Sequence, residues 1–230
     1  MTLLEVDSLR VCYGDYEAVK GVSFSLGERE ILGIVGESGS GKSTIAKTLM
    51  GLQPPSSGTI TFPSSQLPKP SLQMIFQDAV GSLNPRMTIR KTLSEVLRLR
   101  RAKSTAVELL EMVGLSEAVL DQYPRELSGG QCQRVSIARA LACEPEVLIA
   151  DEPVSALDVS VQAKVLNLLR DLNRDLGLSI ILIAHDLAVV RNLCDRICVM
   201  EKGRFVDVGE VDAVFSHPTS DYTRRLLSAS

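Results

Sequence analysis

The sequence has no excess of basic residues. Its 25 lysines and arginines stand against 28 aspartates and glutamates, which leaves a formal net charge of −3. A chain with this balance carries no overall positive field that would attract nucleic acid or an anionic membrane surface. We therefore expect no nucleic-acid partner.

Long hydrophobic runs are also missing. The longest apolar stretches, such as Ile180–Ala184, are far too short to span a bilayer. The stretch Met1–Leu9 has no basic segment followed by an apolar run, so it does not resemble a signal peptide. We expect a cytosolic protein that reaches a membrane only through a partner.

Cysteine and histidine are scarce, with five and two residues. An odd number of scattered cysteines is typical of a reducing compartment. Cys194 and Cys198 are four residues apart and could share a helix face as metal ligands. Because no histidine or second cysteine pair accompanies them, we interpret them as small buried hydrophobic residues.

The residues that are present predict one large α/β domain, or one with an inserted subdomain. Short apolar runs at 31–35, 147–150 and 180–184 predict parallel strands covered on both faces. Helical patterns at 43–50 and 159–176 end at Gly51 and Gly177, which are suitable C-terminal caps.

Other segments depart from this alternation. Leu3–Val6 and Val22–Leu26 alternate as antiparallel strands do. Residues 86–145 are helical in pattern without a strand run, which indicates an inserted helical subdomain. Residues 54–71, rich in proline and serine, predict an irregular hairpin region. Residues 196–209 predict two strands joined by a tight turn.

A glycine-rich loop follows the strand at 31–35. From Gly36 to Ser43 it has the form G-x-x-x-x-G-K-S and opens a helix, which is the setting of a phosphate-binding loop. We expect Lys42 to reach the β- and γ-phosphates of a nucleotide, and the Ser43 hydroxyl to ligate Mg²⁺. The predicted nucleotide-binding residues here are Gly36, Ser38, Gly39, Ser40, Gly41, Lys42, Ser43 and Thr44.

Two acidic residues, Asp151 and Glu152, follow the strand at 147–150. With a phosphate loop in the same chain, Asp151 is suited to hold Mg²⁺, and Glu152 to orient and deprotonate the attacking water. The alternative is an acidic pair that only caps a helix, because Asp-Glu-Pro often begins one. The phosphate loop favours the functional interpretation.

Three further residues could complete a nucleotide site. His185 and Gln77 each follow an apolar strand run, at the carboxyl end where α/β sheets bind ligands. His185 could hydrogen-bond the γ-phosphate or the water, and Gln77 could ligate metal or water, although either alone is more often structural. Tyr13 could stack on a purine ring, although such a tyrosine is more often only a strand residue.

A second glycine motif, Leu127–Gln131, reads LSGGQ and opens another helix. With it, the assembled motifs resemble the ATP-binding-cassette (ABC) ATPases over nearly the whole chain, from about Leu3 to Leu227. The resemblance implies an α/β fold: a P-loop NTPase (RecA-like) parallel-sheet core with an N-terminal antiparallel β subdomain and an inserted α-helical subdomain. The core would comprise residues 1–78 and 146–230, and the helical subdomain that carries LSGGQ would comprise residues 79–145.

The resemblance also implies roles for single residues. ATP and Mg²⁺ are the implied cofactors. The implied catalytic residues are Glu152, His185 and Gln77. The implied metal ligands are Ser43, Gln77 and Asp151. The implied nucleotide contacts outside the phosphate loop are Tyr13, Ser128, Gly129, Gly130, Gln131 and Asp158, the last in the segment 155–158.

In this family LSGGQ acts across a dimer. Two chains pack head to tail, and each ATP lies between the phosphate loop of one chain and the LSGGQ of the other. The physics agrees, because Ser128, Gly129 and Gly130 begin a helix whose N–H groups and dipole suit a γ-phosphate. A two-fold arrangement supplies them in trans.

A finer resemblance rests on residues 76–86, 156–163 and 217–227, which look like the ATPases of oligopeptide, dipeptide and nickel importers. Residues 81–86 are more like the second ATPase of each pair. The implied protein is a peripheral subunit on the cytoplasmic face of the membrane. It binds transmembrane permease subunits and a second, non-identical ATPase, and it serves an extracytoplasmic substrate-binding protein indirectly.

Two departures from that subfamily matter. The chain stops at Ser230 without the cysteine-bearing tail of many peptide importers, which implies no iron–sulfur site there and leans toward shorter nickel or metallophore importers. Cys132 replaces the polar or basic residue common after LSGGQ. The transported substrate is not encoded in these motifs, so peptides, nickel and metal chelates stay open.

Two other functions compete with transport. An accessory ATPase of a phosphonate-degradation complex would resemble the same subfamily. A soluble ABC regulator of ribosomes or nucleic acid usually carries two cassettes or long coiled-coil insertions. This chain has one cassette, no heptad run and no basic patch, which disfavours the second alternative.

Overall fold

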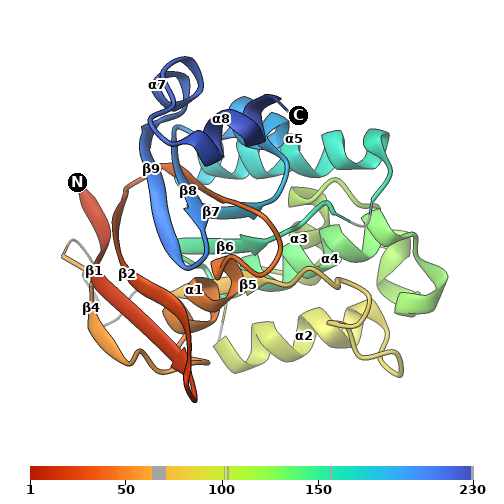
Figure 1. The fold of residues 1–230 in the computed structure, drawn as a ribbon. Coiled ribbons are helices and arrows are strands. Elements are labelled where there is room, and N and C mark those ends of the chain that lie inside the picture. Colours follow the sequence, from red (N-terminus) through yellow and green to blue (C-terminus); the bar gives the residue numbers. More distant parts are fainter. Residues whose placement is uncertain (64–70, 101, 103, 156, 229–230) are drawn as a thin grey trace. The chain divides into compact units, whose positions relative to one another are not determined.

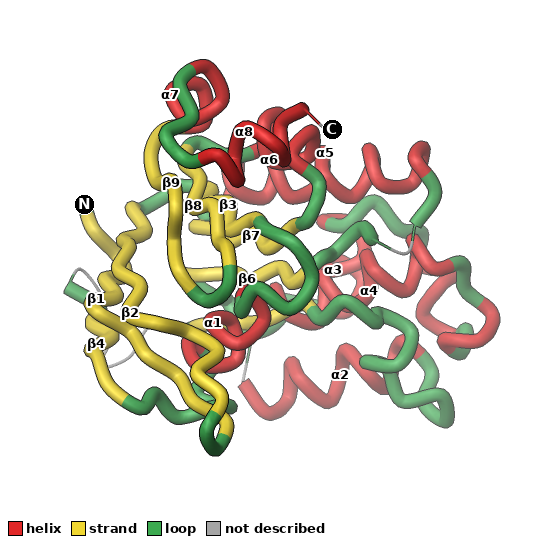
Figure 2. Tube along the Cα trace, in the orientation of Figure 1, coloured by secondary structure: helices red, strands yellow, loops and turns green. Residues whose placement is uncertain are grey.

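The computed structural model describes residues 1–63, 71–100, 102, 104–155 and 157–228. The chain divides into two compact units, which we call unit 1 (residues 1–70 and 172–230) and unit 2 (residues 71–171). Figure 1 follows the chain through both. Figure 2 shows that strands make up much of unit 1, whereas helices predominate in unit 2.

Unit 1 begins with an antiparallel sheet in the order β2-β1-β4. Its strands are β1 (Thr2–Tyr13), β2 (Tyr16–Gly27) and β4 (Ser57–Thr61). The predicted antiparallel strands are therefore confirmed. The prediction of an irregular hairpin at 54–71 is wrong in part, because the alternating residues of β4 pair with β1. Residues 64–70 lie outside the described part of the chain.

The second group of strands in unit 1 is mostly parallel. Strand β3 (Ile31–Val35) pairs in parallel with β7 (Ser179–Ala184) and β8 (Arg196–Glu201), and β9 (Arg204–Glu210) returns antiparallel to β8. Every residue of β3 and β7 is buried, as their continuous apolar runs predict.

Helices follow these strands. Helix α1 (Lys42–Leu49) comes after β3 and α6 (Leu187–Leu193) after β7. Two short helices that the sequence analysis did not predict, α7 (Val211–Ser216) and α8 (Asp221–Ser228), come after β9. The predicted helix ends are confirmed by the left-handed glycines Gly51 (φ 74°) and Gly177 (φ 67°).

Unit 2 holds the parallel pair β5 (Leu72–Ile75) and β6 (Val147–Asp151). Between these strands the chain is helical, as predicted for residues 86–145. The helices are α2 (Ile89–Arg100), α3 (Ala106–Met112), the 3-10 turns η1 (Glu117–Asp121) and η2 (Pro124–Glu126), and α4 (Gly129–Leu141). Helix α5 (Val159–Leu176) begins in unit 2 and ends in unit 1. The subdomain bounds 79–145 stay a prediction.

Cys194 and Cys198 do not share a helix. Cys194 is the C-cap residue of α6, and Cys198 lies within β8, fully buried. Burial raises the pKa of both thiols, that of Cys198 to about 12. Neutral, buried thiols of this kind pack as small hydrophobic residues.

One buried carboxylate holds the end of unit 1 together. Asp207 on β9 accepts hydrogen bonds from the backbone N–H groups of Thr219 (3.0 Å) and Ser220 (3.1 Å) and from the Thr223 hydroxyl (2.5 Å). The Thr219 hydroxyl also donates to it. These bonds fix the segment that leads into α8.

The hydrogen bonds to the Asp207 carboxylate should make the stability of the folded protein depend on pH in the acid range. Burial alone would raise its pKa, but the hydrogen bonds from Thr219, Thr223 and Ser220 outweigh burial and lower the pKa to about 2. The folded pKa lies below the ordinary value of about 3.9. The stabilisation is therefore complete above about pH 4 and is lost as the pH falls toward 2.

We expect Asp207→Asn to lower the free energy of unfolding at pH 7 by about 1.5–3 kcal/mol, because several hydrogen bonds to a charged group are weakened. It should also reduce the loss of stability between pH 4 and pH 2. Urea unfolding across this pH range measures both effects. Asp15→Asn, at an exposed turn carboxylate, is the control and should change neither; an unchanged acid limb in Asp207→Asn would contradict the assignment.

Candidate functional site

The loop between β3 and α1 is closely packed against backbone from other parts of unit 1. A Cβ atom at Gly36 would lie 2.1 Å from the Met200 carbonyl oxygen. At Gly41, which has φ 113°, it would lie 2.6 Å from the Ala18 carbonyl oxygen. Both positions therefore require glycine, and this explains the two glycines that bound the predicted phosphate-binding loop.

Lys42 is buried, with 4% of its surface exposed. Its ammonium group donates hydrogen bonds to the carbonyl oxygens of Gly36 (2.7 Å) and Glu37 (2.8 Å). A buried charge is tolerated only when it is paired or hydrogen-bonded, and here the loop carbonyls provide those acceptors. The ammonium thus lies inside the curve of the loop, beside the N-terminus of α1.

The loop also contains a buried hydroxyl that suits a ligand. The Ser40 Oγ atom is buried, and it has no hydrogen-bond partner among the residues that the structure describes. Ser43 and Thr44 lie half-buried in the first turn of α1, where the Thr44 N–H donates to the Gly41 carbonyl at 3.1 Å. An N-terminal turn with a nearby ammonium and hydroxyls is suited to phosphate oxygens.

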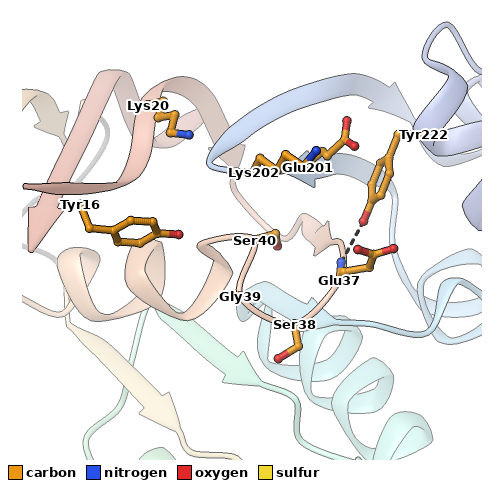
Figure 3. Close-up of a pocket in the computed structure, with 9 residues that line it drawn as sticks. All are labelled: Tyr16, Lys20, Glu37, Ser38, Gly39, Ser40, Glu201, Lys202 and Tyr222. Carbon is orange, nitrogen blue, oxygen red and sulfur yellow. Dashed lines mark hydrogen bonds between the residues drawn. The ribbon is translucent and has the colours of Figure 1, made fainter.

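A pocket of about 280 Å³ opens beside this loop (Figure 3). The loop contributes Glu37, Ser38, Gly39 and Ser40 to its lining. The other lining residues were missed by sequence reasoning, since they come from distant segments without a motif: Tyr16, Lys20, Glu201, Lys202 and Tyr222. Only the chain fold places them beside the loop.

Tyr13 ends β1 with 45% of its surface exposed and pairs with Tyr16 across the β1–β2 turn. It is not among the residues that line the pocket, whereas Tyr16 is. The exposed ring is available for stacking, and the adenine contact of Tyr13 stays a prediction.

His185 leaves β7 at the same edge of the strand group as the loop. Strands β3 and β7 pair in parallel with Val35 opposite Ala184, so Gly36 and His185 follow neighbouring strand ends. The His185 side chain is exposed. The placement at the carboxyl ends of parallel strands is the one that the sequence predicted.

Unit 2 brings Gln77 and Glu152 together. Strands β5 and β6 pair with Ile75 opposite Ala150, and the Gln77 Nε2 group donates to Glu152 Oε2 at 3.1 Å. Asp151, the last residue of β6, is buried. Glu152 has φ 46°, an uncommon left-handed conformation for a residue with a side chain. Such strained positions occur often at functional sites.

The LSGGQ segment forms a helix cap. The Ser128 hydroxyl accepts a hydrogen bond from the Gln131 N–H, and the Gln131 side-chain oxygen accepts one from the Ser128 N–H, at 3.3 Å and 2.9 Å. This reciprocal pair starts α4, as the sequence predicted. Ser128 and Gly129 are exposed and Gly130 is buried, so α4 presents only the start of its first turn to solvent.

Asp158 caps the next helix of unit 2. Its carboxylate accepts hydrogen bonds from the Ser160 hydroxyl (2.8 Å) and the Val161 N–H (3.0 Å), and these bonds lower its pKa. Asp158 therefore stays ionised at neutral pH. Ala156, in the same predicted segment, lies outside the described residues.

Cys132 does not face solvent. Its side chain is fully buried in α4, and its thiol donates to the Pro124 carbonyl at 3.4 Å. Burial raises the pKa of the thiol. This neutral thiol replaces the polar residue expected after LSGGQ by packing inward.

The predicted site residues thus fall into two sets. Unit 1 carries the phosphate loop, Tyr13 and His185. Unit 2 carries Gln77, the acidic pair, LSGGQ and Asp158. Within the described residues, no group of three or more histidine, cysteine or acidic side chains is placed to hold a metal ion by itself.

Comparison with known proteins identifies the family. The family model described as "ABC transporter" matches residues 19–155, more than half of the chain. This chain belongs to the ABC transporter family. Its fold is accordingly that of an ABC ATPase cassette, as the motifs predicted.

Individual relatives with 44–49% sequence identity are named as oligopeptide transport proteins. The oligopeptide transport ATP-binding protein OppF of Escherichia coli is 49% identical, over 93% of this chain and 69% of that protein. The oligopeptide transport ATP-binding protein AppF of Bacillus subtilis is 44% identical, over 94% of this chain and 71% of that protein. The prediction of an oligopeptide-type family member is confirmed.

Solved structures of ABC cassettes have a similar fold. The ATP-binding cassette MJ0796, in a dimeric post-hydrolysis state bound to ADP and phosphate, matches with a TM-score of 0.79 at 29% identity, covering 91% of this chain and 99% of that one. The protein CbiO1 of Clostridium perfringens, part of a transporter complex, matches with a TM-score of 0.81 at 31% identity, covering 94% and 91%. In the described part of this chain, no helix is long and apolar enough to cross a membrane.

The LSGGQ glycines differ in the space around them, which gives a test. A Cβ atom at Gly130 would lie 2.2 Å from Cγ1 of Val161, whereas one at Gly129 would lie 3.4 Å from Leu157, an ordinary contact. Gly130→Ala therefore forces α4 and the start of α5 apart, because the β-branched valine cannot move aside freely.

We expect Gly130→Ala to lower the free energy of unfolding by about 1–3 kcal/mol, the usual cost of overpacking. Gly129→Ala, one residue away, is the matched control and should change it by less than about 0.5 kcal/mol. Urea unfolding of both variants measures the difference. Equal effects would show that the close contact between Gly130 and Val161 does not limit the packing.

Proposed function

We propose that this chain is the ATP-hydrolysing, nucleotide-binding subunit that powers an oligopeptide importer. One observation carries the proposal: the buried Lys42 ammonium, cradled by a glycine loop at a helix N-terminus, occurs in a chain 49% identical to an oligopeptide transport ATP-binding protein. A lysine in this setting binds the phosphates of a nucleotide.

The residues of unit 1 fit ATP. The Ser40 hydroxyl is buried without a partner among the described residues, and the first turn of α1 offers backbone N–H groups. We assign the phosphates to this loop, with Lys42 on the β- and γ-phosphates. Tyr13 is the proposed base-stacking residue.

The donor chemistry also fits Mg²⁺. The Ser43 hydroxyl, the Gln77 side-chain oxygen and the Asp151 carboxylate are hard oxygen ligands of the kind that Mg²⁺ prefers. Mg²⁺ characteristically combines one or two protein carboxylates with the phosphates of a nucleotide, and it would neutralise part of their charge.

Glu152 is the proposed general base. Its carboxylate accepts a hydrogen bond from Gln77, which helps to orient it, and a carboxylate is suited to take a proton from the attacking water. His185 is the proposed hydrogen-bond donor to the γ-phosphate or to that water. Gln77, bonded to Glu152, is the proposed link between the base and the metal.

The functional unit in this proposal is a head-to-tail dimer. Ser128, Gly129, Gly130 and Gln131 of one chain, together with Asp158, would contact ATP held by the partner's phosphate loop. The partner is proposed to be a second, non-identical ATPase. The pair would bind permease subunits at the cytoplasmic face of the membrane, and an extracytoplasmic binding protein would deliver the substrate to the permease from the other side.

The names of the relatives favour oligopeptides as the substrate class. Both relatives reported above are named for oligopeptide transport. The inference toward nickel or metal chelates, which rested on the C-terminus of the chain, gains no support from them. We therefore propose peptides.

Glu152→Gln tests the catalytic assignment. In the complex formed with the permease and the second ATPase, we expect ATP hydrolysis at the site of this Glu152 to fall about 10²- to 10⁴-fold, because a general base is lost. ATP binding should persist and the ATP-bound dimer should accumulate, since glutamine keeps the acceptor for Gln77.

Phosphate release and sedimentation of the ATP-bound complex measure these two effects. Glu111→Gln, an exposed carboxylate on α3, is the control and should hydrolyse ATP normally. If Glu152→Gln hydrolysed ATP at the normal rate, the assignment of Glu152 as the general base would be wrong.

The substrate class is tested by reconstitution. We expect the complex in vesicles to hydrolyse ATP several-fold faster when its binding protein carries a peptide than when that protein is empty. Stimulation by a nickel chelate and not by peptide would reject the oligopeptide assignment. Association of the chain with a lyase complex in place of a permease would indicate the phosphonate function instead, and ATPase stimulation by RNA or DNA would indicate the regulator.

A further inference from the structure

A residue near the end of unit 1 contacts the phosphate loop. Tyr222, in the first turn of α8, has a buried ring, and its hydroxyl oxygen accepts a hydrogen bond from the Glu37 N–H at 2.9 Å. Figure 3 shows this bond at one side of the pocket. It joins residues 185 positions apart in the chain.

The bond acts on the peptide unit that also holds Lys42. The Glu37 N–H and the Gly36 carbonyl belong to one planar peptide group. The Gly36 carbonyl accepts a hydrogen bond from the Lys42 ammonium at 2.7 Å. Tyr222 and Lys42 therefore bind the two ends of the same rigid plane, and a rotation of that plane would disturb both bonds.

The neighbouring peptide unit is fixed as well. The Glu37 carbonyl accepts hydrogen bonds from the Lys42 ammonium (2.8 Å) and from the Ser40 N–H (3.2 Å). The Glu37 N–H bond thus anchors this turn of the loop to a side chain outside it.

Tyr222 is itself held firmly in place. Thr219 and Ser220 before it and Thr223 after it are hydrogen-bonded to the Asp207 carboxylate on β9. Arg225, one helical turn later, lies 4.0 Å from Glu201 at the end of β8. The burial of Tyr222 raises the pKa of its hydroxyl, which stays neutral at physiological pH.

We propose that Tyr222 is a positioning residue of the nucleotide site. Through the Gly36–Glu37 peptide unit it sets the place of the Lys42 ammonium, and so it organises the group that receives the β- and γ-phosphates. The proposal rests on the proposed ATP site. It concerns a residue of the segment that follows β9, which carries no phosphate-binding motif.

Tyr222→Phe tests the proposal, because it removes the hydroxyl and keeps the buried ring. The Glu37 N–H then loses its partner and the peptide plane can rotate. We expect MgATP to bind the full-length chain about two- to tenfold more weakly, the effect of one neutral hydrogen bond. Tyr123→Phe, which removes a tyrosine hydroxyl from unit 2, is the matched control and should leave the dissociation constant unchanged.

A double-mutant cycle with Lys42→Ala separates positioning from a structural role. If Tyr222 acts through Lys42, then Tyr222→Phe should change MgATP binding less than twofold in the Lys42→Ala background, measured at millimolar ATP. An equal loss in both backgrounds would show that Tyr222 acts only on the general stability of the loop, and it would overturn the proposal.

A second variant weakens the support of the Tyr222–Glu37 bond by acting on Asp207, which holds the segment around Tyr222. Asp207→Asn weakens the hydrogen bonds that hold the start of α8, and it leaves the amino acids of the loop and Tyr222 itself unsubstituted. It should weaken MgATP binding in the unmodified chain and have less than a twofold effect in the Lys42→Ala background. This variant keeps the proposal testable if Tyr222→Phe folds poorly.

The outcomes also separate this inference from the proposed function. An unmodified chain that binds no MgATP would remove the proposed ATP site, and this inference with it. An unmodified chain that binds MgATP, together with a Tyr222→Phe chain that binds it equally well, would overturn only the role of Tyr222.

Discussion

The burial of the Lys42 ammonium is the constraint on which unit 1 depends. A cation with 4% of its surface exposed needs acceptors, and the loop supplies two carbonyl oxygens by curving back over it. That curve brings the loop backbone so close to Met200 and Ala18 that only glycine fits at positions 36 and 41. Strands β8 and β2 therefore lie directly against the loop that surrounds the buried ammonium.

Unit 2 depends on a similarly close contact, between the first turns of helices α4 and α5. Gly130 lets the first turn of α4 lie against Val161 of α5, and Asp158 caps the latter helix at the same place. Because Ser128 and Gln131 bond to each other's backbone, the polar side chains of LSGGQ serve mainly to shape the turn. Its exposed backbone is what remains for a ligand.

Much of this could be predicted from the sequence, because the decisive signals are local. The continuous apolar runs gave β3, β6 and β7 within a residue or two, and Gly51 and Gly177 gave the helix ends. The phosphate loop and LSGGQ are contiguous motifs, so their positions followed directly. Strand β4 was missed because prolines and serines around it obscured a short alternating run, and its partner β1 is distant in sequence.

Contacts made by tertiary structure could not be predicted. Nothing in the residues near Gln77 indicates that its amide meets Glu152, and nothing near Tyr222 indicates that its hydroxyl meets Glu37. Helices α7 and α8 are short, and the hydrogen bonds from Thr219 and Thr223 to Asp207 join residues with no shared periodicity. Such contacts depend on chain topology, which a local pattern does not encode.

The bond between Glu37 and Tyr222 has a consequence for synthesis of the chain. The ribosome makes proteins from the N-terminus, so the phosphate loop emerges long before the residue that completes it. Until residue 222 has left the exit tunnel, a nascent chain can hold Lys42 only in a loop that lacks this outer anchor. The phosphate loop is therefore made well before the residue that anchors it from outside.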